Sequence, residues 1–132
     1  MSVLFSIKPE YAEKIFDGSK RYEFRKAVFK REGISEAFVY SSSPTKKIIG
    51  KIRMGPILEG TPETIWRRCS KYSGIRRSEF FAYFKGKDRA YAITIKRVER
   101  LAKPVDPRTL IRNFAPPQSF YYLNEKLMNR LQ

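Results

Sequence analysis

The chain has 132 residues, with 28 Lys and Arg against 13 Asp and Glu, so its net charge is +15 and its sequence pI is about 10.1. Hydrophobic residues make up 42% and aromatic residues 14%, which excludes a disordered chain and fits one domain over residues 1–132. Histidine is absent and Cys69 is the single cysteine, which excludes an intramolecular disulfide, Ser-His-Asp and Cys-His catalysis, and most zinc sites.

The first quarter of the chain predicts a strand, a helix and a second strand. Residues 3–8 are rich in β-forming side chains, and Pro9 fits the first position of a helix, where its missing N–H is not needed. Gly18 is a good helix stop. The next stretch, residues 20–26, alternates aromatic with charged side chains, and its charged face carries Arg21, Glu23 and Arg25.

Two strands and two helices are expected in the middle of the chain. The strands cover residues 36–43 and 46–54, and Gly50 within the second indicates a bulge or a close backbone approach. The first helix begins with Thr61 as N-cap and proline after it, and the second covers residues 78–84 with its serine as cap.

The last third predicts one long strand and one helix. The strand covers residues 89–101, residues 102–110 hold two prolines and predict a loop, and residues 119–131 have the apolar spacing of an amphipathic helix. Strands and helices do not alternate regularly, so a doubly wound parallel sheet is not expected. We predict an α+β fold, a small mixed β pseudo-barrel with peripheral helices that include a C-terminal one.

Four short motifs occur in a fixed order along the chain. A Gly-x-Lys-x-x-Glu-x-Arg signature is formed by Gly18, Lys20, Glu23 and Arg25, between the predicted helix and strand. It is followed by VYSSSP (39–44), IIGKI (48–52) and PPQSFYYL (116–123). Together these motifs resemble those of the ASCH domains, a family of the PUA-like superfamily. The resemblance implies a PUA-like pseudo-barrel with a cleft between sheet and helices. It also implies a role connected with RNA or nucleotides: RNA binding, transcriptional regulation, hydrolysis of amide-modified nucleosides, or RNA cleavage.

The signature supplies the candidate cleft residues. Lys20 is expected to contact a phosphate, or to act as a base if burial and nearby cations lower its pKa. Arg25 can hold a phosphate or carboxylate through two parallel hydrogen bonds. For Glu23 we expect first an ion pair that orients Arg25, and second a ligand contact. If the chain is an enzyme, Lys20 and Glu23 are the catalytic candidates.

The strand that follows adds further candidates to the cleft. Tyr40 alternates with Phe38, so its ring lies either in the core or against a nucleotide base. Ser41, Ser42 and Ser43 are expected to hydrogen-bond a nucleotide, although serines before a proline commonly bond to the local backbone. With no histidine to activate them, we do not expect a serine nucleophile.

A basic segment in the second half predicts contacts with a nucleic-acid backbone. Basic residues are interleaved there with aromatic ones, which is typical of single-stranded nucleic-acid binding. The predicted phosphate contacts are Arg67, Arg68, Lys71, Arg76, Arg77, Lys85 and Lys87. Cys69, among these cations, is expected to be a packed thiol, unless the neighbouring charges make it reactive.

Polyanions, and RNA before DNA, are therefore the expected partners, because neutralising phosphates releases counterions. The first hypothesis is a nucleic-acid-binding module that regulates transcription or RNA metabolism. The alternatives are a hydrolase of a modified nucleoside or a ribonuclease that uses a Lys/Glu cleft, and a C-terminal helix that binds a protein. No motif predicts a cofactor or a metal. No apolar run approaches the ~20 residues of a membrane span, so we expect a cytoplasmic protein without membrane contact.

Overall fold

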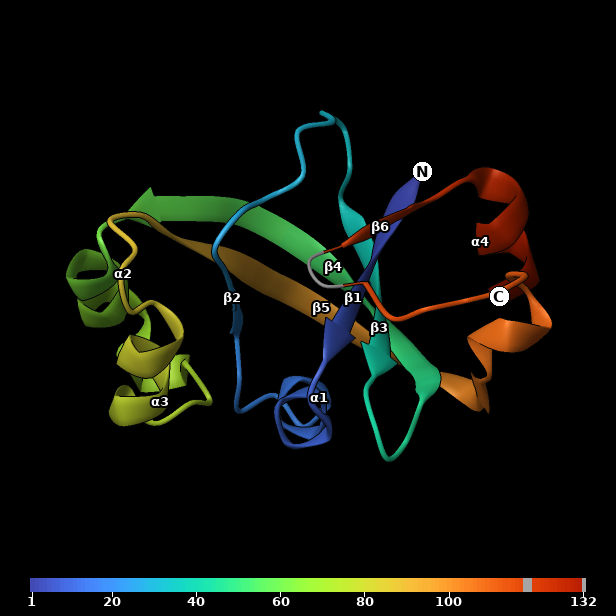
Figure 1. Cartoon of the computed structure of the whole chain (residues 1–132), viewed down its shortest axis with the longest axis horizontal. Helices are drawn as coiled ribbons and strands as arrows, with labels where there is room; N and C mark the ends of the chain where they lie inside the picture. Colours follow the sequence, from blue (N-terminus) through green and yellow to red (C-terminus); the bar gives the residue numbers. More distant parts are fainter. Residues whose placement is uncertain (118–119, 132) are drawn as a thin grey trace.

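A six-stranded mixed sheet forms the centre of the computed structural model, which describes residues 1–117 and 120–131 (Figure 1). The strand order is β2-β5-β4-β3-β1-β6, and only β1 and β3 pair in parallel. The strands are β1 (Ser2–Ile7), β2 (Tyr22–Arg25), β3 (Glu36–Ser41), β4 (Lys47–Gly60), β5 (Ala90–Val105) and β6 (Tyr121–Leu123). The helices are α1 (Pro9–Phe16), α2 (Pro62–Cys69), α3 (Arg77–Tyr83) and α4 (Glu125–Leu131), with 3-10 turns η1 (Ser70–Tyr72) and η2 (Pro107–Thr109). This arrangement confirms the predicted mixed sheet with peripheral helices, including a C-terminal one.

The two long strands β4 and β5 run side by side through most of the molecule, and the helical segment α2–η1–α3 connects them at one end (Figure 1). Their pairing shifts register at three places, and one of these is next to Gly50. A Cβ at Gly50 would lie 2.5 Å from the Phe16 ring and 2.7 Å from the carbonyl oxygen of Glu99. The bulge and the close approach expected at this glycine are therefore both present, and they let α1 pack against the sheet.

Three hydrophobic clusters hold the elements together. The first lies on the inner face of the sheet under α1 and includes Val3, Phe5, Ile15, Val39 and Ile52. The second packs α2 and α3 onto β2 and β5 and includes Phe24, Ile65, Cys69, Phe80 and Phe84. The third joins β1 and β3 to the C-terminal segment and includes Leu4, Phe38, Tyr40, Leu123 and Leu131. The contact of Phe24 with Phe80 in the second cluster places helix α3 next to the charged strand β2.

The structure corrects three local predictions. Residues 119–131 do not form one helix: within the part described, Tyr121–Leu123 form a strand that pairs with β1, and the helix begins at Glu125; Ser119 lies outside the described residues. The second middle helix begins at Arg77, so Ser78 lies inside it and is not its cap. The last long strand continues through Val105 into the predicted loop.

Among the described helices, none is long and apolar enough to cross a membrane.

Candidate functional site

A cleft of about 650 Å³ lies where the end of β1, the start of α1, strand β2 and helix α3 meet. It brings together residues that are as much as 77 positions apart in the sequence, from Ser6 to Tyr83. All three charged residues of the Gly-x-Lys-x-x-Glu-x-Arg signature line it. Its lining consists of Ser6, Ile7, Lys8, Glu10, Tyr11, Lys20, Glu23, Phe24, Arg25, Ile75, Glu79, Ala82 and Tyr83.

Lys20 is a buried lysine in the wall of this cleft, with only 2% of its surface exposed. Its ammonium nitrogen donates a hydrogen bond to the carbonyl oxygen of Ser73 at 2.7 Å and lies 4.7 Å from the centre of the Phe24 ring. Burial lowers the pKa of Lys20 to about 8; the negative charge of Glu23 opposes this shift and the cations Lys14 and Arg25 add to it. Lys20 is therefore able to exchange a proton near neutral pH.

The position of Lys20 follows from the end of helix α1. Gly18 takes a φ of +88°, a conformation that glycine adopts without a steric penalty, and turns the chain away from the helix. The backbone N–H of Lys20 then donates to the carbonyl oxygen of Lys14 at 2.9 Å. On the other side, Gly74 leaves no room beside the lysine, since a Cβ there would lie 2.5 Å from the Lys20 Cβ. The stem of Lys20 is thus held between α1 and residues 73–75.

Glu23 and Arg25 form a buried ion pair two residues apart on one face of β2. The distance from the Arg25 Nη2 to the Glu23 Oε2 is 2.8 Å, and each residue is 7% exposed. The Arg25 guanidinium also donates to the carbonyl oxygen of Ser6 at 3.3 Å and stacks 4.5 Å above the Phe5 ring. Glu23 and Arg25 are therefore held together in the lining of the cleft. Arg21, in contrast, is exposed and precedes the strand.

A hydrogen-bonded bridge crosses the cleft between α1 and α3. The Tyr11 hydroxyl donates to one carboxylate oxygen of Glu79, and the Arg76 Nε donates to the other at 2.9 Å. Burial and the adjacent Glu79 raise the pKa of Tyr11 above its usual range, whereas the hydrogen bonds from Tyr11 and Arg76 lower the pKa of Glu79. Glu79 is thus a carboxylate at neutral pH, and it places an acidic group from the second half of the chain at the cleft.

The structure does not bring the other predicted cleft residues to this site. Tyr40 is 4% exposed and packs in the third hydrophobic cluster, 5.2 Å from Phe114 between ring centres. Side chains of β3 point alternately to its two faces, and Tyr40 is on the face that packs against the C-terminal residues. Tyr40 is therefore a core residue and is not placed to stack on a base. Ser41 is buried, Ser42 is half-buried and Ser43 is exposed, and none of the three lines the cleft.

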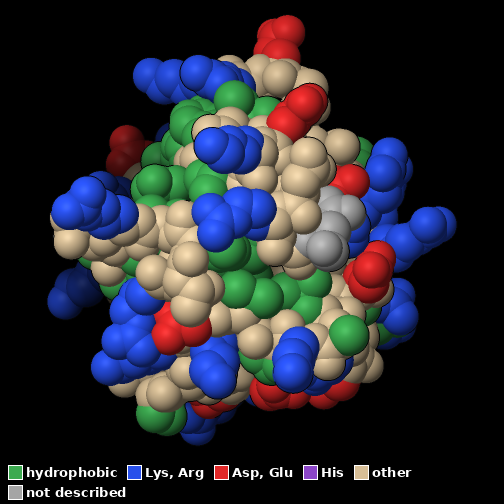
Figure 2. Space-filling model, turned by 90° about the vertical axis from the view of Figure 1, so that its right-hand side faces the viewer, with side chains coloured by type: hydrophobic (Ala, Val, Ile, Leu, Met, Phe, Trp, Pro, Cys, Tyr) green, Lys and Arg blue, Asp and Glu red, His purple; other side chains and the backbone are tan. Residues whose placement is uncertain are grey.

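The predicted phosphate contacts all lie on the helical segment or the turn after it. Arg67 and Arg68 are on α2, and Lys71 is on η1. Arg76 and Arg77 are at the start of α3, and Lys85 and Lys87 follow it. All seven side chains are exposed. Positive charge is not confined to this side. Figure 2 shows Lys and Arg side chains spread over the face that carries the C-terminal helix, so charge alone does not locate a binding site.

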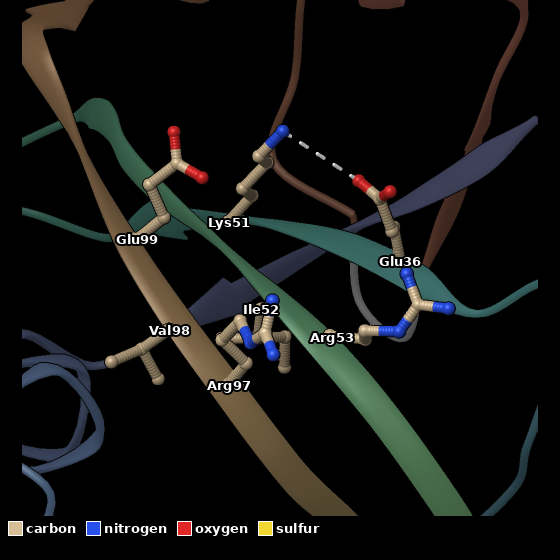
Figure 3. A pocket seen from close by; sticks show the side chains of 7 residues that line it. All are labelled: Glu36, Lys51, Ile52, Arg53, Arg97, Val98 and Glu99. Atoms are coloured by element: carbon tan, nitrogen blue, oxygen red, sulfur yellow. Dashed lines mark ion pairs between the residues drawn. The ribbon is translucent and has the colours of Figure 1, made fainter.

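A second hollow of about 160 Å³ lies over β3, β4 and β5 (Figure 3). Charges of both signs alternate around it, and the Lys51 ammonium is 3.8 Å from a Glu36 oxygen (Figure 3). Its charged lining is Glu36, Lys51, Arg53, Arg97 and Glu99. The hollow is a quarter of the size of the Lys20 cleft, and both carboxylates sit beside cations, so it is the weaker candidate for an anionic ligand.

Tyr11, Glu79 and Tyr83 line the cleft as well, although no short motif in the sequence distinguishes them. Only the tertiary packing of α3 against β2 brings Glu79 and Tyr83 to the signature residues. Cys69 is 1% exposed and burial raises its pKa to about 11, so it is a packed thiol. Among residues 1–117 and 120–131, no three His, Cys, Asp or Glu side chains are grouped to hold a metal ion.

The arrangement combines three chemical functions within one cleft. Lys20 can give or take a proton near pH 8. Arg25 offers a fixed guanidinium for an anion. Two carboxylates, Glu23 from β2 and Glu79 from α3, also line the cleft. Proton transfer next to an anion-binding group is the chemistry of ester or amide cleavage in a phosphorylated or carbonyl-containing substrate.

Comparison with known proteins assigns the chain to a family. A family model described as "Domain of unknown function (DUF365)" matches residues 1–114. An ASCH domain-containing ribonuclease of Zymomonas mobilis is 28% identical over 131 residues, which are 97% of this chain and 88% of that protein. The large ribosomal subunit protein uL22 of Ureaplasma parvum is 30% identical over 105 residues, 80% of this chain. The match covers 34% of that protein, so this chain spans about a third of its length.

The similarity extends to the three-dimensional structure. The crystal structure of the ASCH protein from Zymomonas mobilis superimposes with a TM-score of 0.92 at 26% identity, covering 98% of this chain and 92% of that one. The mixed, open barrel-like sheet with its C-terminal helix is thus the fold of an ASCH domain, in agreement with the motif resemblance. The chain belongs to the family described as a domain of unknown function, DUF365, and has an ASCH domain fold.

Proposed function

We propose that this chain binds RNA and cleaves it in the cleft around Lys20. The observation that carries the proposal is the buried Lys20, whose pKa is about 8, beside the buried Glu23–Arg25 pair in a cleft of about 650 Å³. A lysine has to be desolvated in this way to serve as a base at neutral pH. The full-length similarity to a protein named a ribonuclease supports the choice of RNA as substrate.

The chemistry follows from the two basic side chains. The neutral amine of Lys20 takes the proton from a ribose 2′-hydroxyl, and the 2′-oxygen attacks the adjacent phosphorus. The bond from phosphorus to the 5′-oxygen of the next nucleotide breaks, and that oxygen takes a proton from water. The hydroxide that remains takes the proton from Lys20, which restores the neutral amine. The products are a 2′,3′-cyclic phosphate and a 5′-hydroxyl. Arg25 donates to the non-bridging phosphate oxygens, on which negative charge increases in the transition state.

The electrostatics of the whole chain favour capture of a polymer. The net charge of +15 attracts polyanions over long distances, and the seven exposed cations from Arg67 to Lys87 lie on the segment that forms one wall of the cleft. Binding should therefore weaken steeply as salt increases. A free nucleotide would need much less charge than this surface provides.

A second candidate function is hydrolysis of an amide-modified nucleoside. The observation that favours it is Glu79, which supplies a carboxylate from α3 across the cleft from Lys20. A lysine and a carboxylate on opposite sides of a carbonyl carbon can activate water and protonate the leaving amine. N4-acetylcytidine is the direct probe for this activity.

The test uses one RNA sequence in single-stranded and duplex form, the same sequence as DNA, and N4-acetylcytidine. Wild type is compared with Lys20→Ala and with Lys103→Ala, which removes the same charge from an exposed position near the end of β5. Each reaction is run with and without added divalent cations. The proposal predicts cleavage of single-stranded RNA to 2′,3′-cyclic ends by wild type and Lys103→Ala, and none by Lys20→Ala.

Three results would overturn the proposal in distinguishable ways. Tight, salt-sensitive binding without cleavage would leave a binding module alone. Release of acetate from N4-acetylcytidine without RNA cleavage would establish the second candidate. Cleavage that persists in Lys20→Ala would move the reaction away from the cleft.

A further inference from the structure

Two exposed tyrosines each have a cation stacked on the ring: Tyr83 lines the cleft, and Tyr72 precedes the residue whose carbonyl oxygen binds Lys20. Tyr72 is 37% exposed and Tyr83 is 38% exposed, although large aromatic side chains in this chain are otherwise mostly covered. The Arg21 guanidinium lies 4.2 Å from the centre of the Tyr72 ring, and the Lys26 ammonium lies 4.4 Å from the centre of the Tyr83 ring. Both pairs join the charged strand region to the helical segment, since Arg21 precedes β2 and Lys26 follows it.

Tyr83 belongs to the cleft itself. It ends helix α3 and lines the cleft together with Glu23 and Arg25. Its ring contacts Phe84 edge to face, with 4.8 Å between ring centres, which fixes its orientation on the second hydrophobic cluster. Lys26, which covers it, follows directly after β2. A ring held this firmly loses little further entropy when a planar group stacks on it.

Tyr72 lies next to the backbone group that holds Lys20. It ends η1, and its carbonyl oxygen accepts a hydrogen bond of 2.8 Å from the N–H of Arg21. The carbonyl oxygen of the following residue, Ser73, accepts from the Lys20 ammonium. The backbone at Tyr72 and Ser73 therefore positions both the proposed base, Lys20, and the exposed Tyr72 ring. The Arg21 guanidinium adds a flat, positively charged group next to that ring.

We propose that Tyr83 with Lys26, and Tyr72 with Arg21, are two base-stacking subsites that hold the nucleotides on either side of the cleaved phosphate. This inference rests on the proposed function and names residues that select the substrate without taking part in proton transfer. A base stacks on an aromatic ring with little regard to its identity, and the adjacent cation contacts the phosphate of the same nucleotide. Bases that stack on side chains have to leave a duplex, so the substrate is an unpaired segment of at least two nucleotides.

A third exposed tyrosine provides a matched control. Tyr121 is 38% exposed, like Tyr83, but it lies on β6 and is not part of the cleft lining. Among the described residues, no Lys or Arg side chain is stacked on its ring. The variant Tyr121→Ala therefore removes an equally exposed tyrosine ring, but not one of the two proposed stacking subsites.

The experiment measures the affinity for single-stranded RNA whose 2′-hydroxyls are methylated, so that no cleavage interferes. Tyr72→Ala and Tyr83→Ala should each weaken binding roughly ten- to hundredfold, the range that the loss of one stacked base produces. The variants Tyr72→Phe and Tyr83→Phe keep the ring and should bind like wild type, as should Tyr121→Ala. An abasic nucleotide at the matching position of the RNA should remove the difference between Tyr→Ala and wild type.

The outcomes separate this inference from the proposed function. If wild type cleaves RNA but neither Tyr→Ala variant loses affinity, the stacking subsites are wrong and the proposed function stands. Equal losses in Tyr72→Ala, Tyr83→Ala and Tyr121→Ala also overturn the inference, because the effect would then be a general one of exposed aromatic surface. If wild type binds no RNA, both proposals fail together.

Discussion

Gly74 lies so close to Lys20 that a Cβ on the glycine would be 2.5 Å from the Lys20 Cβ and 2.7 Å from its Cγ. The Cβ is fixed by the Lys20 backbone and the stem is buried, so it has little room to move aside. Ser73 and Gly74 therefore define the position of the Lys20 ammonium in two ways, by the Ser73 carbonyl and by this contact. Both residues lie in the segment that follows η1, which carries no signature residue.

Gly74→Ala is expected to abolish RNA cleavage by displacing Lys20. The glycine has a φ of +64°, so alanine also adds backbone strain of roughly 1–2 kcal/mol. Gly86→Ala is the matched control, because Gly86 has a φ of +79° and nothing within 4 Å of its Cβ position. Urea unfolding should show backbone strain in both variants and a larger loss of stability in Gly74→Ala, which adds the clash with Lys20. Cleavage assays should show a loss of activity only in Gly74→Ala. Full activity in a folded Gly74→Ala protein would contradict the role of the Lys20 position.

The stability of the protein should record the burial of the Lys20 charge. Its pKa is about 8 in the folded protein and 10.5 when exposed, so below pH 8 both states are protonated and the full penalty for the buried charge is present. Between pH 8 and 10.5 the unfolded chain binds more protons, and the folded state gains stability. The free energy of unfolding of wild type minus that of Lys20→Met should therefore rise by about 3 kcal/mol over this interval.

Urea unfolding of wild type, Lys20→Met and Lys103→Met from pH 7 to pH 10 measures this difference. The comparison with Lys103→Met removes the contributions of the other titrating groups, since Lys103 is exposed. A difference between wild type and Lys20→Met that does not change with pH would show that Lys20 has an ordinary pKa, and would remove the physical basis for a lysine base.

The Glu23–Arg25 pair should show strong energetic coupling. Either partner alone would leave a charge that is buried to more than nine-tenths, and breaking such a pair costs roughly 3–5 kcal/mol. We expect Glu23→Gln and Arg25→Met to destabilise the protein separately, and the double variant to be less destabilised than the sum of the two. Chemical unfolding of the four proteins measures the coupling. Additive effects would mean that the two side chains are fixed by their surroundings and not by each other.

Reversal of two charges on α2 should weaken RNA binding without changing cleavage of bound RNA. Arg67→Glu with Arg68→Glu is expected to lower the affinity for all RNA sequences alike, and to reduce the slope of log affinity against log salt by about two. The control, Lys103→Glu with Arg112→Glu, changes the net charge equally at exposed positions outside the helical segment. Equal loss in both double variants would show that only the total charge matters.

Local patterns were sufficient for most elements but not for the C-terminal one. The signals at Pro9, Gly18, Thr61 and Gly50 act within a few residues, and each has the structure expected of it. Residues 121–131 have an apolar spacing that fits one helix, yet Tyr121–Leu123 pair with β1, more than 110 residues earlier. Helix α4 starts only after Asn124, whose side chain accepts from the N–H of Leu127 at 2.9 Å. Pairing over such a separation leaves no local signature.

The same limit applies to the candidate site. Lys20, Glu23 and Arg25 lie within six residues, so their proximity follows from one turn and one strand. Tyr40 lies on a strand that is buried on both faces, and the C-terminal segment covers the face that carries Tyr40. Glu79 and Tyr83 reach the cleft because α3 packs on β2, a contact between elements more than 50 residues apart. The sequence therefore indicated one wall of the cleft and left the other open.

The dependence of cleavage rate on pH tests the central claim most directly. If neutral Lys20 is the base, kcat/KM for a single-stranded oligoribonucleotide should rise about tenfold per pH unit below pH 8 and level off above it. Lys20→Arg, which keeps a charge but cannot lose its proton, should be inactive at every pH. A profile without an inflection near pH 8, or an active Lys20→Arg protein, would contradict the account.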